Sequence, residues 1–130
     1  MTSSSFYVNL LLVAIGGALG SVARSVLSTL VLRASGSLFP VGTFVVNAIG
    51  CLVFGLIVGV SEQRLPLAPA TRAFLLVGVL GGFTTFSSYA FESFSLARDS
   101  QFAAAAVNLV GQVVAGFIGM WAGVAVGGAL

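Results

Sequence analysis

The sequence predicts an all-α membrane protein with four transmembrane helices. Of its 130 residues, 58% are hydrophobic and only 6% are charged. An ordinary soluble domain carries about 25% charged residues, so this chain lacks the charge to cover a water-facing surface. Four long stretches contain no charged side chain, at residues 1–23, 41–60, 73–91 and 102–130. Each is long enough to cross the roughly 30 Å hydrocarbon core of a bilayer as a helix.

Composition excludes several classes of protein. The chain has five arginines, three acidic residues and one cysteine, Cys51, but neither histidine nor lysine. These counts exclude a disulfide framework, a Cys/His zinc site and a His-based catalytic triad. The pI near 9.3 reflects only two surplus arginines, with no basic stripe, so we expect no nucleic-acid partner. We expect the protein to lie in a lipid bilayer and to be no enzyme, with no catalytic residues.

We expect one transmembrane domain of residues 1–130, with spans at about 6–32, 41–60, 73–97 and 102–127. The linkers between these spans hold most of the charges and all three prolines. The N-terminus has no basic residues of the kind that begin a signal peptide, so we expect the first stretch to be a span. The sequence therefore indicates a multi-pass membrane protein.

Glycines spaced four apart predict close helix packing. Such pairs and triplets lie along one face of a helix and let two backbones approach closely in lipid. Packing inside one bundle would explain them, and so would additional packing between subunits. The sets are Gly16/Gly20, Gly55/Gly59, Gly78/Gly82 and Gly119/Gly123/Gly127.

The arginines give no clear membrane orientation. One side of the membrane would hold Arg64 and Arg72, and the other would hold Arg33 and Arg98, with Arg24 as a third if it sits near the end of the first helix. With so even a distribution, the positive-inside rule favours neither orientation. This even distribution has two explanations. The arginines are too few to be informative, or the chain inserts in both orientations and forms an antiparallel two-fold dimer.

The third span contains an unusual mixture of glycines and hydroxyl residues. Two glycines (Gly81 and Gly82) are followed by Thr84, Thr85 and two serines near the middle of 73–91. A helix break near 83–85 would release carbonyls suited to a cation and N–H groups suited to an anion. An intact helix whose small residues pack against a neighbour explains the pattern equally well.

Polar and aromatic side chains on the other spans are candidates for an ion path. Phe86 and Tyr89 share a helix face, and the positive edge of an aromatic ring attracts an anion weakly. Asn47 lies near the middle of 41–60, with Thr43 one turn earlier. The fourth span has a polar stripe of Asn108, Gln112 and Gly116. These groups would serve either as contacts between helices or as a pore lining without fixed positive charge.

Three segments resemble the Fluc/CrcB family of fluoride channels. They are GGALGSVAR at 16–24, GTFVVNAIG at 42–50 and GVLGGFTTFS at 78–87, and the resemblance extends from about residue 14 to 127. It implies a passive, fluoride-selective channel that exports fluoride and protects the cell from its toxicity. It also implies an antiparallel, dual-topology homodimer with two narrow pores and a sodium ion buried at the interface. The expected location is the inner or plasma membrane of a prokaryote.

The resemblance also implies roles for individual residues. Asn47 matches the pore asparagine that donates its amide N–H to fluoride, and Phe86 matches a phenylalanine whose ring edge faces the ion. Gly81 and Thr84 match the positions whose backbone carbonyls, from both subunits, hold the sodium. Arg24 resembles an arginine near the vestibule.

The fit to the family is not complete. Thr43 matches the threonine one turn before the asparagine, but Tyr89 stands where the family often has a second phenylalanine. Its hydroxyl would donate either to fluoride or to a neighbouring helix. Asn108 and Gln112 stand where the family usually has tyrosine and serine. Glu92 matches an acidic position in the family, to which the resemblance assigns no role.

Two other functions remain open from the sequence. A small proton-coupled multidrug exporter has a similar length, but it needs a carboxylate deep in a helix. Here the first span has no acid, and Glu92 keeps this alternative open only narrowly. In a non-transporting membrane assembly subunit, the polar residues would serve only to pack helices together.

Overall fold

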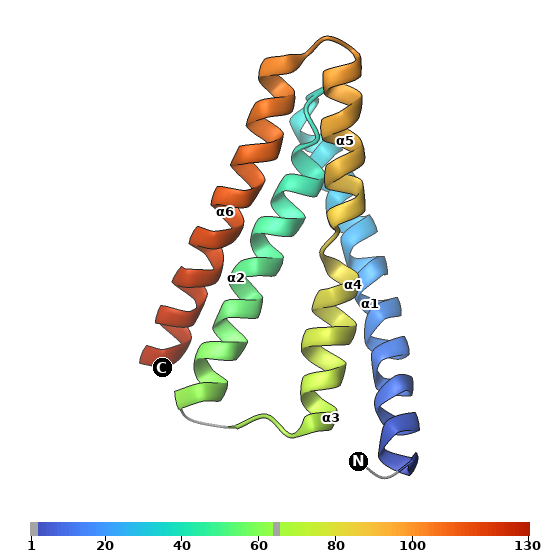
Figure 1. Cartoon of the computed structure of the whole chain (residues 1–130), viewed down its shortest axis with the longest axis vertical. Coiled ribbons are helices and arrows are strands. Elements are labelled where there is room, and N and C mark those ends of the chain that lie inside the picture. Colours follow the sequence, from blue (N-terminus) through green and yellow to red (C-terminus); the bar gives the residue numbers. More distant parts are fainter. Residues whose placement is uncertain (1–2, 64–65) are drawn as a thin grey trace.

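The computed structural model describes residues 3–63 and 66–130, and within these ranges the chain is helical without any strand (Figure 1). Four segments are long and apolar enough to cross a membrane: Ser5–Ser35, Val41–Gln63, Pro69–Arg98 and Phe102–Ala129. The predicted all-α class with four membrane-spanning segments is therefore confirmed. The helices are α1 (Ser3–Ser35), α2 (Val41–Gln63), α3 (Pro69–Arg72), η1 (Ala73–Leu80), α4 (Gly81–Phe83), α5 (Phe86–Arg98) and α6 (Phe102–Ala129).

Arginines lie near both ends of the molecule. Figure 1 shows the two termini and α3 at one end, and the α5–α6 connection at the other. Arg72 ends α3, whereas Arg33 and Arg98 lie in the last turns of α1 and α5. Arg64, which entered the sequence-based count, lies outside the described residues. The described arginines thus do not gather at one end.

The helices pack as two pairs, α1 with η1 and α4, and α2 with α6. A Cβ on Gly16 would lie 2.6 Å from the Phe74 carbonyl oxygen, and one on Gly59 would lie 2.9 Å from the Gly128 nitrogen. Glycine is needed at such positions because any side chain would force the backbones apart. Glycines spaced four apart therefore pack against helices of the same chain.

The two pairs separate toward the end that holds the termini (Figure 1). Few large apolar side chains are buried between them, and many lie on the outside. Trp121, for example, is 75% exposed. Such a continuous apolar exterior is suited to lipid or to another protein surface.

The third hydrophobic segment changes its winding along its length. After α3 it continues as the π-helix η1 and the short α4, a winding that the sequence did not predict. Thr84 and Thr85 are extended, with φ and ψ of −81° and 157° and of −148° and 117°. The Thr85 side chain accepts a hydrogen bond from the Ser88 N–H and so caps the start of α5.

Candidate functional site

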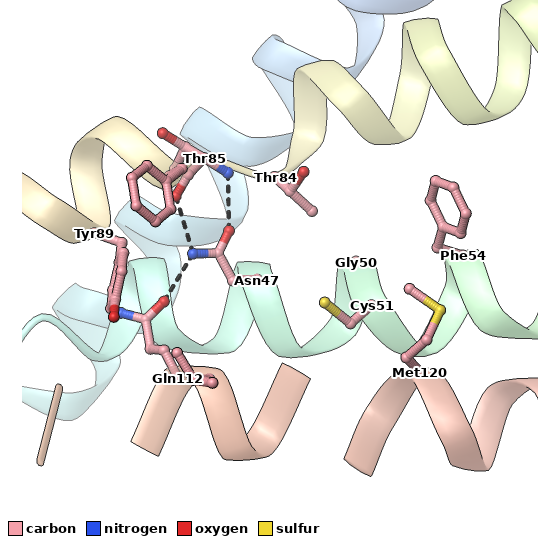
Figure 2. Close-up of a pocket in the computed structure, with 11 residues that line it drawn as sticks. Asn47, Gly50, Cys51, Phe54, Thr84, Thr85, Tyr89, Gln112 and Met120 are labelled. Carbon is pink, nitrogen blue, oxygen red and sulfur yellow. Dashed lines mark hydrogen bonds between the residues drawn. The ribbon is translucent and has the colours of Figure 1, made fainter. Parts of the chain in front are cut away.

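A cavity of about 360 Å³ opens between the two helix pairs, and we call it the Asn47 cavity (Figure 2). Its wall combines α2, the extended Thr84–Thr85 link, α5 and α6. It gathers polar and aromatic side chains that lie far apart in the sequence. These include Asn47, Thr84, Thr85, Phe86, Tyr89 and Gln112.

The Asn47 side chain pairs with the backbone of Thr85. Its Oδ1 accepts the Thr85 N–H at 2.9 Å, and its Nδ2 donates to the Thr85 carbonyl at 3.1 Å (Figure 2). Thr85 is buried, so its backbone groups would be costly to leave unpaired. Asn47 therefore supplies partners that regular helix would otherwise provide, and it fixes the position of the extended link.

From Asn47, hydrogen bonds continue through α6 to α5. Asn47 Nδ2 donates to Gln112 Oε1 at 2.7 Å, and Gln112 Nε2 donates to Asn108 Oδ1 at 2.9 Å. Asn108 Nδ2 then donates to Ser93 Oγ at 2.8 Å, and Ser93 Oγ donates to the Tyr89 carbonyl at 2.8 Å. We call Asn47, Gln112, Asn108 and Ser93 the amide chain. Each residue of the amide chain donates to the next, in the order Asn47, Gln112, Asn108 and Ser93.

The two aromatic residues of α5 have different surroundings. The Phe86 ring is 79% exposed and lies at the open side of the Asn47 cavity, 5.5 Å from the Tyr89 ring centre. Tyr89 is buried, and its hydroxyl donates to the Leu109 carbonyl at 2.9 Å. Of the two roles expected for that hydroxyl, the structure shows the bond to a neighbouring helix.

The extended link also frees two backbone carbonyls. In a continuous α-helix, the Gly81 and Thr84 carbonyls would accept the N–H groups of Thr85 and Ser88. Here Thr85 N–H bonds to Asn47 Oδ1, and Ser88 N–H bonds to Thr85 Oγ1. Carbonyl oxygens that lack their helical donors are ligands of the kind that a hard cation prefers. In the part of the chain described, no cluster of His, Cys, Asp or Glu offers a metal site instead.

A second cavity, of about 340 Å³, lies beside the first part of α2, and we call it the Glu92 cavity. Thr43 Oγ1 donates to Glu92 Oε1 at 2.5 Å, while Glu92 Oε2 is buried without a hydrogen-bond partner among the described residues. Ser28 and Ser37 also contribute to its wall. Thr43 therefore faces a carboxylate rather than the Asn47 cavity.

The structure brings together only some of the predicted site residues. Asn47, Phe86, Tyr89, Gln112 and Thr84 share the Asn47 cavity. The other four lie elsewhere: Asn108 is fully buried behind Gln112, Thr43 lines the Glu92 cavity, and neither cavity is lined by Arg24 or Gly81.

Sequence reasoning missed two kinds of residue. It assigned no role to Ser93, although Ser93 follows Tyr89 by one helical turn and ends the amide chain. It also missed the part of the Asn47 cavity wall that α2 forms beyond Asn47, which includes Gly50 and Phe54. Their spacing of three and seven residues from Asn47 places them on the same face of α2, and this signal was available.

Comparison with known proteins places the chain in a family. Residues 11–124 match the family described as CrcB-like protein, Camphor Resistance (CrcB). A fluoride-specific ion channel FluC from Maridesulfovibrio salexigens is 47% identical over 117 residues, which is 90% of this chain and 93% of the relative. Proteins of the same name from Nitratidesulfovibrio vulgaris and Methylobacillus flagellatus are each 46% identical, over 91% and 87% of this chain and 95% and 89% of the relatives.

These matches cover almost the whole apolar chain and include all four membrane-spanning segments in whole or in large part. They were expected from the three segments at 16–24, 42–50 and 78–87, so the predicted family is confirmed. With its four apolar segments, the chain is a multi-pass membrane protein, and it belongs to the CrcB-like family.

Proposed function

We propose that this protein is a passive fluoride-selective channel that exports fluoride down its electrochemical gradient and protects the cell from fluoride. The observation that carries this proposal is the Asn47 cavity, in which side-chain amides and the exposed Phe86 ring meet with no charged group among the described lining residues. The relatives named as fluoride-specific ion channels support it. A neutral lining attracts an anion without holding it too tightly to leave.

In the proposed path, fluoride enters a vestibule near Arg24 and exchanges water for hydrogen-bond donors. Asn47 and Gln112 offer amide N–H groups in the wall of the Asn47 cavity, whereas Asn108 behind Gln112 and Thr43 beside Glu92 would have to release their present acceptors, Ser93 and Glu92, to serve as further donors. Fluoride then passes the positive edge of the Phe86 ring, beside Tyr89. Chloride is larger and a weaker acceptor, so it fits such a path poorly.

We propose an antiparallel, dual-topology homodimer as the working assembly, in the inner membrane of a prokaryote. Each subunit is then a single transmembrane domain whose third span is broken near mid-membrane at Thr84 and Thr85. The spread of the arginines over both ends supports insertion in either orientation. The exposed Phe86 ring supports a second subunit that completes the wall of the Asn47 cavity.

A structural sodium ion is part of this proposal. Gly81 and Thr84 would hold it through their backbone carbonyls, one pair from each subunit. The diversion of the Thr85 and Ser88 N–H groups to side-chain acceptors supports this assignment. The ion would stabilise the contact between the broken third spans of the two subunits and would take no part in fluoride movement.

Fluoride efflux from liposomes tests the proposed function. The purified protein should release trapped fluoride, followed with a fluoride electrode, and should release chloride far more slowly. Phe86→Ala should abolish the efflux, because it removes the ring edge from the open side of the Asn47 cavity. Phe94→Ala is the matched control, since Phe94 is also exposed on α5 and lines neither cavity.

The same assay separates the other functions. A proton-coupled exporter would move substrate only in response to a pH gradient, and a non-transporting assembly subunit would give no flux. Fluoride efflux that is equal in wild type and Phe86→Ala would contradict the assigned path. No fluoride efflux from wild-type protein would contradict the proposed function.

A further inference from the structure

We propose that Gln112 is a specificity-determining residue whose carboxamide turns over when fluoride binds. Before the turn its oxygen accepts a hydrogen bond from Asn47, and after the turn its nitrogen donates a hydrogen bond to fluoride, alongside Asn47. This inference rests on the proposed function and deepens it. The bonds of the amide chain carry the proposal.

Asn47 has no free donor in the structure. A carboxamide nitrogen carries two hydrogens, and those of Asn47 go to the Thr85 carbonyl and to Gln112 Oε1. The bond to Thr85 belongs to the clamp that fixes the extended link. The bond to Gln112 joins two side chains at 2.7 Å, so the Gln112 oxygen accepts the hydrogen that fluoride would accept.

With an anion present, the amide chain can be reversed without a net loss of hydrogen bonds. At present Asn47 donates to Gln112, Gln112 to Asn108, Asn108 to Ser93, and Ser93 to the Tyr89 carbonyl. Turning the carboxamides of Gln112 and Asn108 over interchanges their nitrogens and oxygens, because the two ends of the group have nearly the same shape. Ser93 then donates to Asn108, Asn108 donates to Gln112, and Gln112 and Asn47 both donate to an ion.

Fluoride is what makes the reversed chain favourable. Without an ion, the N–H groups of Asn47 and Gln112 would face one another, and two donors repel. An anion between them accepts from both, and hydrogen bonds to an ion are stronger than those between neutral groups. The site lies in the Asn47 cavity, whose lining includes both residues and Phe86. Two converging donors favour fluoride over chloride, which is the larger and weaker acceptor.

Burial requires the residues of the amide chain to change together. Asn108 is fully buried, and Ser93 and Gln112 are 3% and 7% exposed. Water therefore cannot satisfy one member while the others stay as they are, and each reversal forces the next. The Tyr89 carbonyl that Ser93 releases lies inside α5, where it keeps its ordinary helical donor.

Side-chain amide NMR tests this inference directly. In the wild-type protein in detergent, sodium fluoride should shift the Asn47 Nδ2 and Gln112 Nε2 signals together, whereas sodium chloride should shift neither. Asn108→Asp, when its carboxylate is ionised, can accept but not donate, so it should then hold Gln112 in its present orientation and abolish the Gln112 shift. A fluoride shift at Asn47 without one at Gln112 in wild type would overturn the inference.

Efflux from liposomes provides the functional measurement. Gln112→Met keeps the length of the side chain but removes its donor, and fluoride efflux should fall about 10- to 100-fold, as expected for one lost hydrogen bond to an ion. Gln101→Met is the matched control, because Gln101 is exposed just before α6 and lines neither cavity. It should conduct like wild type.

The outcomes separate this inference from the proposed function. Wild-type efflux that is unchanged in Gln112→Met would overturn only the role of Gln112. No wild-type efflux would overturn the proposed function and this inference with it. Loss of efflux in Gln112→Met, together with the paired NMR shifts in wild type, would support both.

Discussion

The Asn47 cavity and the Glu92 cavity differ in chemistry although both adjoin the same face of α2. Asn47 and Thr43 lie one helical turn apart, yet each belongs to a different cavity. Around Asn47, neutral donors and acceptors are paired with one another. Beside Thr43, a carboxylate keeps one buried oxygen without a partner in the described part of the chain. Position along a helix therefore does not by itself decide the chemistry that a polar side chain meets.

The difference has a consequence for an anion. Amide donors stabilise fluoride, whereas the Glu92 carboxylate, when ionised, repels it. In a membrane interior that repulsion is poorly screened, because little water or salt is present. On the proposed function, the Asn47 cavity is thus the place where an anion is recognised. An anion passes through the Glu92 cavity only if the carboxylate is neutral or its negative charge is balanced. Three substitutions test this contrast.

The largest effect is expected for Asn47→Ala. It removes the donor to the proposed ion and both partners of the buried Thr85 backbone. Fluoride efflux should fall at least about 100-fold, and the unfolding free energy should fall by about 2 kcal/mol or more. Liposome efflux measures the first change, and thermal unfolding in detergent measures the second. The proposed dimer should still form.

Asn9→Ala is the control for that substitution. Asn9 also lies in a membrane-spanning helix but lines neither cavity, so its loss should leave efflux close to wild type. If Asn47→Ala destabilised the protein but still conducted fluoride at the wild-type rate, Asn47 would serve only as a clamp. The contrast between the two cavities would then lose its functional meaning.

A smaller effect is expected for Glu92→Gln. Glutamine keeps an oxygen that can accept from Thr43 Oγ1 but removes the charge. Fluoride efflux should therefore stay equal to wild type or rise, by no more than about tenfold. An imposed pH gradient should have no effect on it. Glu62→Gln, at an exposed position near the end of α2, is the matched control.

Loss of transport in Glu92→Gln, with Glu62→Gln unchanged, would contradict this expectation. It would indicate that a carboxylate within the third membrane-spanning segment is needed for transport, as in a proton-coupled exporter. The two cavities would then have exchanged roles, with the acid as the working group and the amides as helix contacts.

Sequence alone predicted the outline of this molecule well. The scarcity of charge and the four uncharged stretches predicted four membrane-spanning helices, and the segments at 16–24, 42–50 and 78–87 predicted the family. Both depend on local patterns, which need no knowledge of how the helices meet. The functional roles of Asn47, Phe86 and the sodium-binding carbonyls stay predictions.

What the sequence could not predict depends on contacts between helices. Spacing placed Thr43 and Asn47 on one face, but only the packing of α5 assigns Thr43 to Glu92. Likewise, spacing cannot show that Asn47 uses both of its hydrogens, or that Ser93 ends the amide chain. The direction of these hydrogen bonds depends on how α2, α5 and α6 pack together, so the sequence of one helix alone does not predict it.

The smallest effect is expected for Tyr89→Phe, which tests whether the tyrosine belongs to the ion path or to the helix packing around it. Its hydroxyl already donates to the Leu109 carbonyl at 2.9 Å, so no hydrogen is left for fluoride. Removing it should cost about 1 kcal/mol of stability and leave fluoride efflux within about twofold of wild type.

Tyr7→Phe, at an exposed position on α1, is the control for that substitution and should change neither quantity. A tenfold loss of efflux in Tyr89→Phe with unchanged thermal unfolding would show that the hydroxyl leaves Leu109 to contact the ion. The wall of the Asn47 cavity would then supply a donor from α5 as well as those from α2 and α6. In that case, recognition of the anion would involve the aromatic pair as much as the amide chain.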